Sequence, residues 1–188
     1  MIQLQGQAQS KKLGQNTRLF NLKKGGKTQS SSFFRVAPFS TLTLELSDYT
    51  RITASSNTVF YIIEEHEHFT ILLKEGTIKV KAMQRLKNQN TRKIVVKTHK
   101  ARVETSLGEF IVAYMGVMEH TTVYGLSGLT LFNAKASFNK EKVVEIYAND
   151  ESELTSLLER PANPSQYSEK KKKELEAFFI PKSKRTKN

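Results

Sequence analysis

Short segments in which polar and apolar residues alternate, with turn-forming residues between them, constrain the fold of this chain more than any other feature. Residues 41–46 place three leucines on one face and polar side chains on the other, which is the period-two pattern of a half-buried strand. Residues 58–63 are rich in β-branched and aromatic side chains, which favour strands. Comparable segments recur at intervals of about 8–12 residues. We expect further strands at 69–73, 77–82, 93–98, 101–104, 109–115, 121–124, 129–133 and 143–147.

This series predicts an all-β fold of stacked β-hairpins, arranged as a sandwich or a short β-solenoid. An internal repeat favours stacking, because residues 69–82 align without gaps on residues 121–134. Each copy consists of a strand, a glycine and a second strand. Gly76 and Gly128 are the equivalent glycines, and Gly108 marks a third turn. Glycine at a turn favours a left-handed backbone, which a residue with a Cβ adopts only at a cost.

Composition divides the chain into four segments. Residues 150–153, three of which are acidic, precede three leucines, which predicts a short helix. A second helix is expected from Ser168 to Ile180, where Pro181 ends it. Two prolines between the helices indicate a linker. The expected organisation is a polar basic arm (1–32), an all-β domain (33–148), a short helix (149–160), and a linker with a basic helical tail (161–188).

Residues 36–147 resemble the FecR-type domain, a periplasmic domain family of iron-citrate signalling regulators. The resemblance rests on three motifs, which are Leu73-Lys-Glu-Gly76-Thr-Ile78-Lys-Val80, Thr98-His-Lys-Ala101-Arg-Val103 followed by 107–112, and Thr121-Thr122-Val123 before the turn at Gly128. The sequence departs from the family pattern at His99, where the family has proline, and at Leu107-Gly108, where it has Gly-Thr. The resemblance implies an all-β, non-enzymatic interaction domain in the periplasm or cell envelope, with the cytoplasm as the alternative location.

Several classes of function are excluded by what the sequence lacks. The chain has no cysteine, so disulfide frameworks, thiolate catalysis and cysteine-ligated zinc are excluded. It contains no G-x-S-x-G, Walker or H-E-x-x-H motif, and its nine glycines fall at turns instead of forming a phosphate-binding loop. No apolar run approaches the roughly 18 residues of a membrane-spanning helix, and the N-terminus shows no signal-peptide pattern. We therefore predict a protein that is not an enzyme and needs no cofactor.

Residues 64–68 form the one cluster in the sequence with metal-like spacing. His66 and His68 would point to the same face of a strand, which is a usable ligand spacing. A third ligand is not apparent, and a charged hairpin end exposed to water explains the same residues. The sequence therefore predicts no metal site, with His66 and His68 as weak candidates.

Positive charge is unevenly distributed along the chain, whose formal net charge is +12. Residues 31–160 are nearly neutral, but residues 76–103, here called the basic ribbon, carry nine cations and no acid. These cations are Lys79, Lys81, Arg85, Lys87, Arg92, Lys93, Lys97, Lys100 and Arg102. A segregated positive surface favours an acidic partner, although lysines that protect sheet edges would give the same pattern. Nucleic acid is the less favoured partner, because no aromatic residue lies between Phe69 and Phe110 to stack on bases.

The C-terminal tail joins a run of four lysines, 170–173, to an apolar cluster that ends in Phe178, Phe179 and Ile180. Such a cluster can dock in a groove of a partner or lie on an anionic membrane surface. Together these features predict a non-catalytic structural or adaptor subunit of a bacterial cell-envelope assembly. It would bind other proteins, of its own or another kind, through its basic arms and the basic ribbon. The alternatives are a basic nucleic-acid-binding module and a periplasmic ligand-sensing domain.

Overall fold

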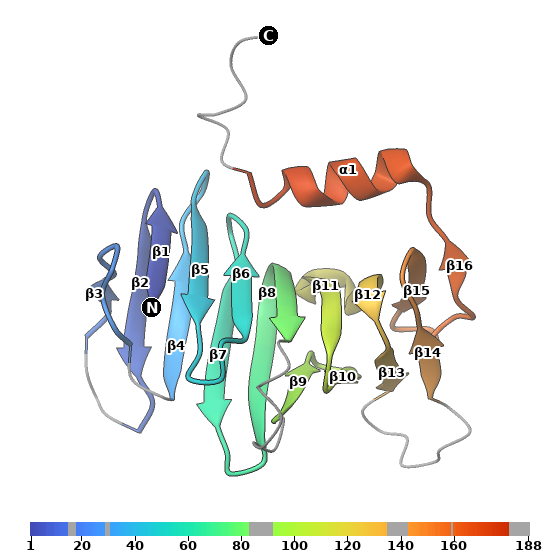
Figure 1. Cartoon of the computed structure of the whole chain (residues 1–188), viewed down its shortest axis with the longest axis horizontal. Coiled ribbons are helices and arrows are strands. Elements are labelled where there is room, and N and C mark those ends of the chain that lie inside the picture. Colours follow the sequence, from blue (N-terminus) through green and yellow to red (C-terminus); the bar gives the residue numbers. More distant parts are fainter. Residues whose placement is uncertain (15–17, 29–30, 83–91, 135–142, 159, 181–188) are drawn as a thin grey trace, which may run out of the picture.

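The fold consists of two β-sheets that share one long strand (Figure 1). The computed structural model describes residues 1–188 except 15–17, 29–30, 83–91, 135–142, 159 and 181–188. Sheet A contains, in spatial order, β1 (Ile2–Gln5), β5 (Thr41–Glu45), β6 (Arg51–Ala54), the second half of β8 (His68–Ala82), β11 (Gly108–Met115), β12 (His120–Gly128), β15 (Asp150–Leu154) and β16 (Ser165–Gln166). The prediction of an all-β fold is confirmed.

Sheet B continues from the first half of the same strand. Its spatial order is β3 (Phe20–Asn21), β2 (Ala8–Lys12), β4 (Ser32–Val36), β7 (Val59–Glu64), the first half of β8, β9 (Lys93–Lys97), β10 (Ala101–Thr105), β13 (Thr130–Ala134) and β14 (Val144–Ile146). Among the described strands, all neighbouring pairs in both sheets are antiparallel except β8 and β9, which are parallel.

The core lies between the two sheets, because their inward-facing side chains belong to one apolar cluster. Alternate residues of each strand contribute to it, as the period-two pattern predicts. Sheet A supplies residues such as Leu42, Ile52 and Val112, and sheet B supplies residues such as Phe60 and Ile71. Each of these side chains is almost completely buried.

Gly76 marks the point where β8 leaves sheet B and enters sheet A. Residues before it pair with β7, and residues after it pair with β6 and β11. Its φ is +95°, and a Cβ at this position would lie 2.7 Å from the backbone Cα of Thr58. Gly128 (φ +72°) lies at the equivalent place between β12 of sheet A and β13 of sheet B, and Gly108 (φ +139°) is its partner in the ladder. The two copies of the sequence repeat therefore both change sheets at their glycine, but in opposite directions.

Three further residues with positive φ lie where the chain passes between sheets at the same edge as Gly76. They are Gly6 (φ +83°), Phe39 (φ +56°) and Asn57 (φ +59°). Gly6 packs directly against Ser40, and Gly76 packs against Thr58, so successive corners lie on one another. This stacking of corners is what brings loops from distant parts of the sequence together at the edge of the sandwich.

Part of the segment expected to be a polar arm (1–32) is strand. β1 pairs with β5 and β2 pairs with β4, so both belong to the sandwich. Ile2 and Ala8 are buried while their neighbours are more exposed. Strands at or near the edge of a sheet need few apolar residues, so the composition of β1 and β2 resembles that of a solvated arm. The docked N-terminal residues therefore extend both sheets.

The prediction of a helix within 149–160 is wrong, because residues 150–154 form strand β15. Ser152 and Leu154 are buried and alternate with acidic residues that face outward, so the acids do not cap a helix. The second helix is confirmed as α1 (Glu169–Ala177), and the side chain of Ser168 caps it by accepting a hydrogen bond from the N–H of Lys171. None of the helices in the described part of the chain is long and apolar enough to cross a bilayer.

Candidate functional site

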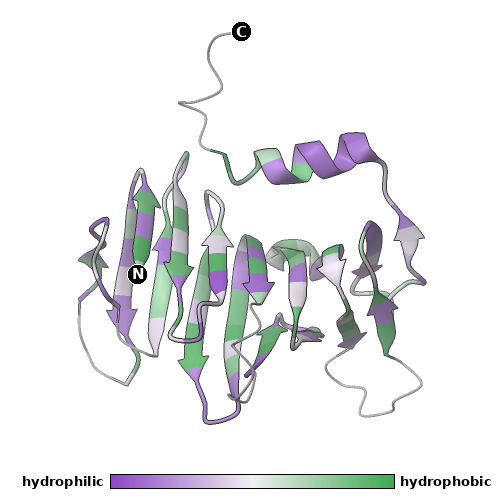
Figure 2. Cartoon of the chain, viewed as in Figure 1, coloured by the Kyte–Doolittle hydropathy of each residue, from purple (hydrophilic) through white to green (hydrophobic). Residues whose placement is uncertain are grey.

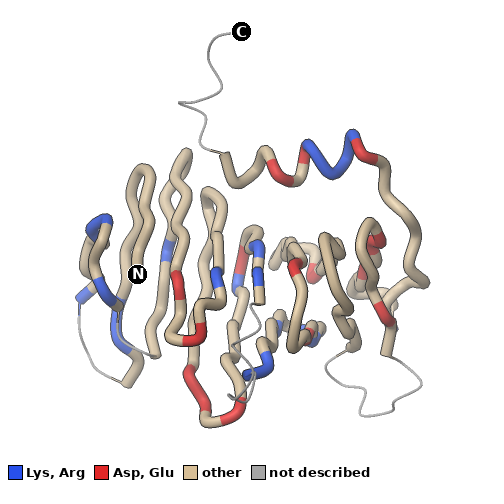
Figure 3. The backbone as a smooth tube through the Cα atoms, viewed as in Figure 1, with Lys and Arg blue, Asp and Glu red and all other residues tan. Residues whose placement is uncertain are grey.

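Most of the described cations of the basic ribbon lie beside carboxylates. Figure 3 marks the basic and acidic residues along the backbone. Lys79 and Lys81 project from sheet A, and both lie 3.4 Å from carboxylate oxygens of Glu109. Three more cations are paired with carboxylates, namely Arg92 with Glu64, Lys100 with Glu119, and Arg102 with Glu104. Lys93 and Lys97 lie on β9 of sheet B. Arg85 and Lys87 lie outside the described residues.

The histidines of the 64–68 cluster lie at the turn between β7 and β8. The imidazole of His68 lies against the carboxylate of Glu65, and His66 is exposed. Within the described ranges, no group of three or more His, Cys, Asp or Glu residues is placed to hold a metal ion. His66 and His68 are thus a charged turn in which one histidine is already paired.

Helix α1 lies outside the sandwich and packs on the outer face of sheet A. A second apolar cluster joins Leu175 of the helix to Ile111 of β11 and Tyr124 of β12. Tyr167, which precedes the helix, belongs to the same cluster, and Phe179, which follows it, packs against it. Figure 2 shows that α1 is hydrophilic over much of its length and more apolar toward its C-terminal end. The helix therefore binds the sheet through a few apolar side chains.

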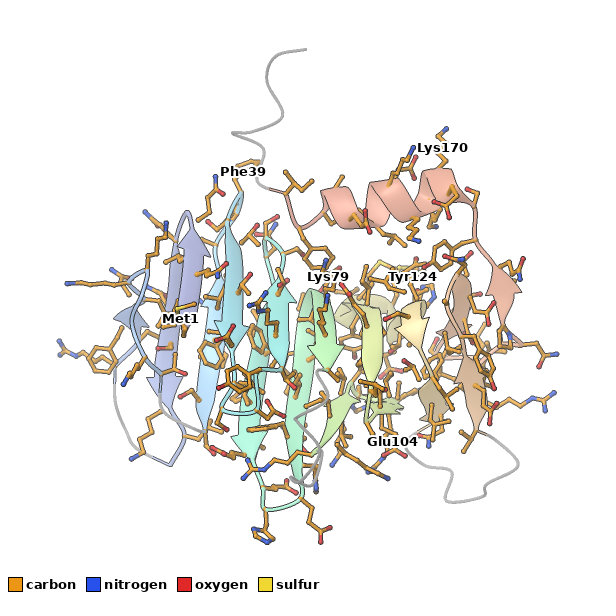
Figure 4. All side chains as sticks on the ribbon, viewed as in Figure 1. Met1, Phe39, Lys79, Glu104, Tyr124 and Lys170 are labelled. Carbon is orange, nitrogen blue, oxygen red and sulfur yellow. The ribbon has the colours of Figure 1, made fainter. Side chains whose placement is uncertain are left out.

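Two cation–π contacts accompany this packing. The ammonium of Lys171 lies 5.5 Å from the centre of the Tyr124 ring and 3.9 Å from the Glu151 carboxylate. The ammonium of Lys79, on β8, lies 5.5 Å from the centre of the Phe179 ring. Figure 4 shows Lys79 and Tyr124 on sheet A, on the side where α1 lies. Cations thus bind aromatic rings in both directions, from helix to sheet and from sheet to the segment after the helix.

The tyrosines near this contact stay protonated at neutral pH. Burial raises the pKa of Tyr167 to about 12, with Glu169 and Glu151 adding to the shift, and its hydroxyl donates a hydrogen bond to the carbonyl of Gly125. Burial also raises the pKa of Tyr124, although the nearby Lys171 lowers it. Tyr167 therefore acts as a hydrogen-bond donor, and both rings act as packing groups. A general acid or base would need a pKa moved toward neutrality, which neither has.

A groove of about 670 Å³ separates the end of α1 from the corners of the sandwich. One wall consists of Glu174, Ala177, Phe178 and Ile180, and the other consists of residues 38–41 and 56–57. We call this the rim groove. Phe39 is 72% exposed, Phe178 60% and Ile180 49%, so three large apolar side chains from two distant parts of the sequence border one hollow. Figure 4 places Phe39 at this end of the helix.

The C-terminal residues singled out from the sequence therefore separate into two roles. Phe179 packs on the chain's own sheet A, whereas Phe178 and Ile180 line the rim groove. Phe39 was not predicted as part of a site. Its signal in the sequence is a large aromatic residue directly after Pro38 at the start of a turn, where polar residues are usual.

Comparison with known proteins supports the fold but names no family. The sequence matches no family model and no curated protein. Two solved structures of putative anti-sigma factors from Parabacteroides distasonis ATCC 8503 are similar, with TM-scores of 0.61 and 0.60 and 14% sequence identity. They match 76% and 75% of this chain, and this chain spans 63% and 62% of theirs. The chain thus shares its fold with these proteins over less than two thirds of their length.

Proposed function

We propose that this chain is a non-catalytic protein-binding domain of the regulatory or sensing kind, acting as an adaptor in a bacterial cell-envelope assembly. The observation that carries the proposal is the rim groove, which Phe39, Phe178 and Ile180 border with exposed apolar surface. Exposed apolar surface gathered around a hollow is typical of sites that bind other proteins. The fold of the putative anti-sigma factors and the resemblance to the FecR-type domain favour a regulatory role in the envelope.

The chemistry of the groove favours a partner segment with an apolar anchor and a neighbouring basic residue. Phe178 and Ile180 offer apolar contact to the anchor, and Glu174 is the charged residue among the described residues that line the groove. A lysine or arginine beside the anchor would pair with Glu174. Such a pair at the edge of an interface adds to specificity more than to affinity.

The structure favours this surface over the basic ribbon. Nucleic acid binding by charge alone needs cations that phosphates can reach, and most of the described ribbon cations are already paired with carboxylates. Adaptor binding through the ribbon would need the same cations. The rim groove needs no such rearrangement.

Site-specific photo-crosslinking in the native cells tests the proposal. A photoreactive phenylalanine analogue would replace Phe178 or, in a matched control, Phe20 of β3, which is 59% exposed and does not line the groove. We expect a discrete nuclease-resistant crosslink to one protein from position 178 and none from position 20. The crosslinked peptide of the partner should contain an apolar residue next to a lysine or arginine.

A second variant, Phe178→Ser combined with Ile180→Ser, should abolish capture of the same partner. The proposal would be overturned if both positions crosslink to the same set of proteins. It would also be overturned if the crosslinked species is a nucleic acid, or if the double variant retains the partner.

A further inference from the structure

The outer face of sheet A carries an apolar strip beneath α1. Ile111, Tyr124 and Leu126 point away from the core and form the separate cluster that includes Leu175. Ile111 has no exposed surface, although it lies on the outer face. An outward-facing strand position is normally polar, so these three residues need a cover. We call them the helix-binding strip.

The helix that covers the strip gains its order from the strip. It is nine residues long and contains four consecutive lysines, and helices this short are marginal in water without tertiary contacts. Leu175 is the one residue of α1 that is buried. Lys171 and Leu175 lie four residues apart on one side of the helix, where they contact Tyr124 and the cluster. Phe179, four residues after Leu175 and just beyond the helix, packs against the same cluster and contacts Lys79.

The connection before the helix allows α1 to leave while the rest of the fold stays intact. Tyr167 is held by two hydrogen bonds of its own, from its N–H to the carbonyl of Asn149 and from its hydroxyl to the carbonyl of Gly125. β16 is paired with β15 just before it. Tyr167 therefore keeps two hydrogen bonds that do not involve α1, and a change of backbone at Ser168 would let the helix leave.

We propose that the strip is a binding surface for lysine-bearing amphipathic helices, that α1 is its resident occupant, and that a helix of a partner protein can exchange with it. The partner helix carries a lysine and two large apolar residues at successive spacings of four, the spacing of Lys171, Leu175 and Phe179. Charge complementarity supports this choice, because Glu151 lies beside the strip where the lysine of the occupant binds. This surface is separate from the rim groove, so the proposal goes beyond the function proposed above.

Exchange also couples the two surfaces. Residues of α1 and of the turn after it form one wall of the rim groove, so release of the helix removes that wall. A ligand in the rim groove therefore favours the docked state of α1. A partner helix bound to the strip in place of α1 weakens the binding of a ligand in the groove. This reciprocity follows from linkage between the two equilibria.

A synthetic peptide of residues 168–180 with a fluorescent label is the probe. It would be titrated against the full chain and against the full chain with Leu175→Asp and Phe179→Asp, which undocks the resident helix. We expect the peptide to bind the undocked chain at least about tenfold more tightly than the wild type, because the resident helix competes in the wild type. A peptide carrying Lys171→Glu should bind the undocked chain several-fold more weakly, since it loses the contacts to Tyr124 and Glu151.

Ile111→Ser in the undocked chain tests the location, and it should abolish peptide binding. Hydrogen exchange of β8 and β12 amides would show that the sandwich is intact in each variant, and a milder Phe179→Ser variant replaces the double variant if it is not. The proposal would be overturned if the peptide fails to bind a folded chain whose helix amides exchange freely. Equal binding to the wild type, or binding that survives Ile111→Ser, would also overturn it.

Discussion

The ammonium of Lys79, in the middle of the molecule, lies 5.5 Å from the centre of the Phe179 ring, near the C-terminal end of the chain. The same ammonium lies 3.4 Å from a carboxylate oxygen of Glu109. The contact joins β8, which belongs to both sheets, to the segment that follows the external helix. The side chain of Lys79 therefore shares its charge between a carboxylate in the sheet and an aromatic ring beyond it.

Lys79→Met should loosen α1 more than Lys81→Met does. Both lysines lie 3.4 Å from Glu109, but of the two it is Lys79 whose ammonium lies over the Phe179 ring. Loss of that contact costs about 0.5–1 kcal/mol, so the amides of α1 should exchange with solvent about two- to fivefold faster in Lys79→Met. Hydrogen exchange measured by mass spectrometry checks this. Equal exchange in the two variants would show that the Phe179 contact does not hold the helix.

Stability should fall above pH 10 in a way that depends on Tyr167. Its pKa is about 12 in the folded chain against a usual value of 10.0, so the folded state favours the protonated phenol. The stabilisation is fully present below pH 10 and is lost as the pH rises from 10 to 12, where the unfolded chain has released the proton and the folded chain has not. Tyr167→Phe should cost about 1 kcal/mol at pH 7 through the lost hydrogen bond to Gly125. The difference from the wild type should shrink through this window. Denaturant unfolding of the wild type and of Tyr167→Phe at several pH values measures this difference in stability. A difference that stays constant from pH 7 to 12 would contradict the prediction.

Gly76→Ala should destabilise the fold far more than Gly25→Ala. Both glycines have positive φ, +95° and +78°, so both variants incur the cost of a left-handed alanine, about 1 kcal/mol. A Cβ at Gly76 also overlaps the backbone of Thr58, whereas a Cβ at Gly25 has no atom within 4 Å. We expect Gly76→Ala to lower the free energy of unfolding by about 3 kcal/mol, because overpacking adds to the cost of the left-handed backbone. Equal losses in thermal unfolding would mean that the corner at Gly76 can relax.

Glu109→Gln should strengthen binding to a polyanion. Two ribbon cations, Lys79 and Lys81, lose their carboxylate and become available to phosphate or sulfate. Retention on heparin should move to higher salt, while stability changes by about 1 kcal/mol or less because both ion pairs are partly exposed. Glu145→Gln, on β14, makes the same change in charge away from the ribbon and serves as the control. Identical retention of the two variants would show that net charge, not the ribbon, determines the binding.

Local pattern was sufficient to predict most of the strands. The alternation in 41–46 and the apolar run 58–63 correspond to β5 and β7, and Ser168 caps α1 where a helix was expected. Local pattern failed for β15, because acidic residues before leucines look like a helix start. The segment becomes a strand because it pairs with β12, where Glu153 lies opposite Thr122 and its carboxylate is 2.9 Å from the imidazole of His120. Such pairing is set by residues far apart in the sequence.

The candidate site was harder to predict than the strands, because it is formed by contacts between residues far apart in the sequence. The sequence indicated that the tail could dock, but not that its target is the chain's own sheet. One signal was present, since residues 110–113 read Phe-Ile-Val-Ala, an unbroken apolar run. Such a run is typical of a strand that is covered on both faces. It implied a cover over β11, and α1 is that cover.

The strand β8 has a consequence for how the molecule comes apart. Because its first half completes sheet B and its second half completes sheet A, neither layer has a set of hydrogen bonds that can open alone. A fluctuation large enough to separate one layer must also break the ladder of the other. Partial unfolding is thereby restricted to the periphery, at the outermost strands and α1. Both proposed binding surfaces involve α1, which belongs to this periphery. The rest of the sandwich unfolds only as a whole.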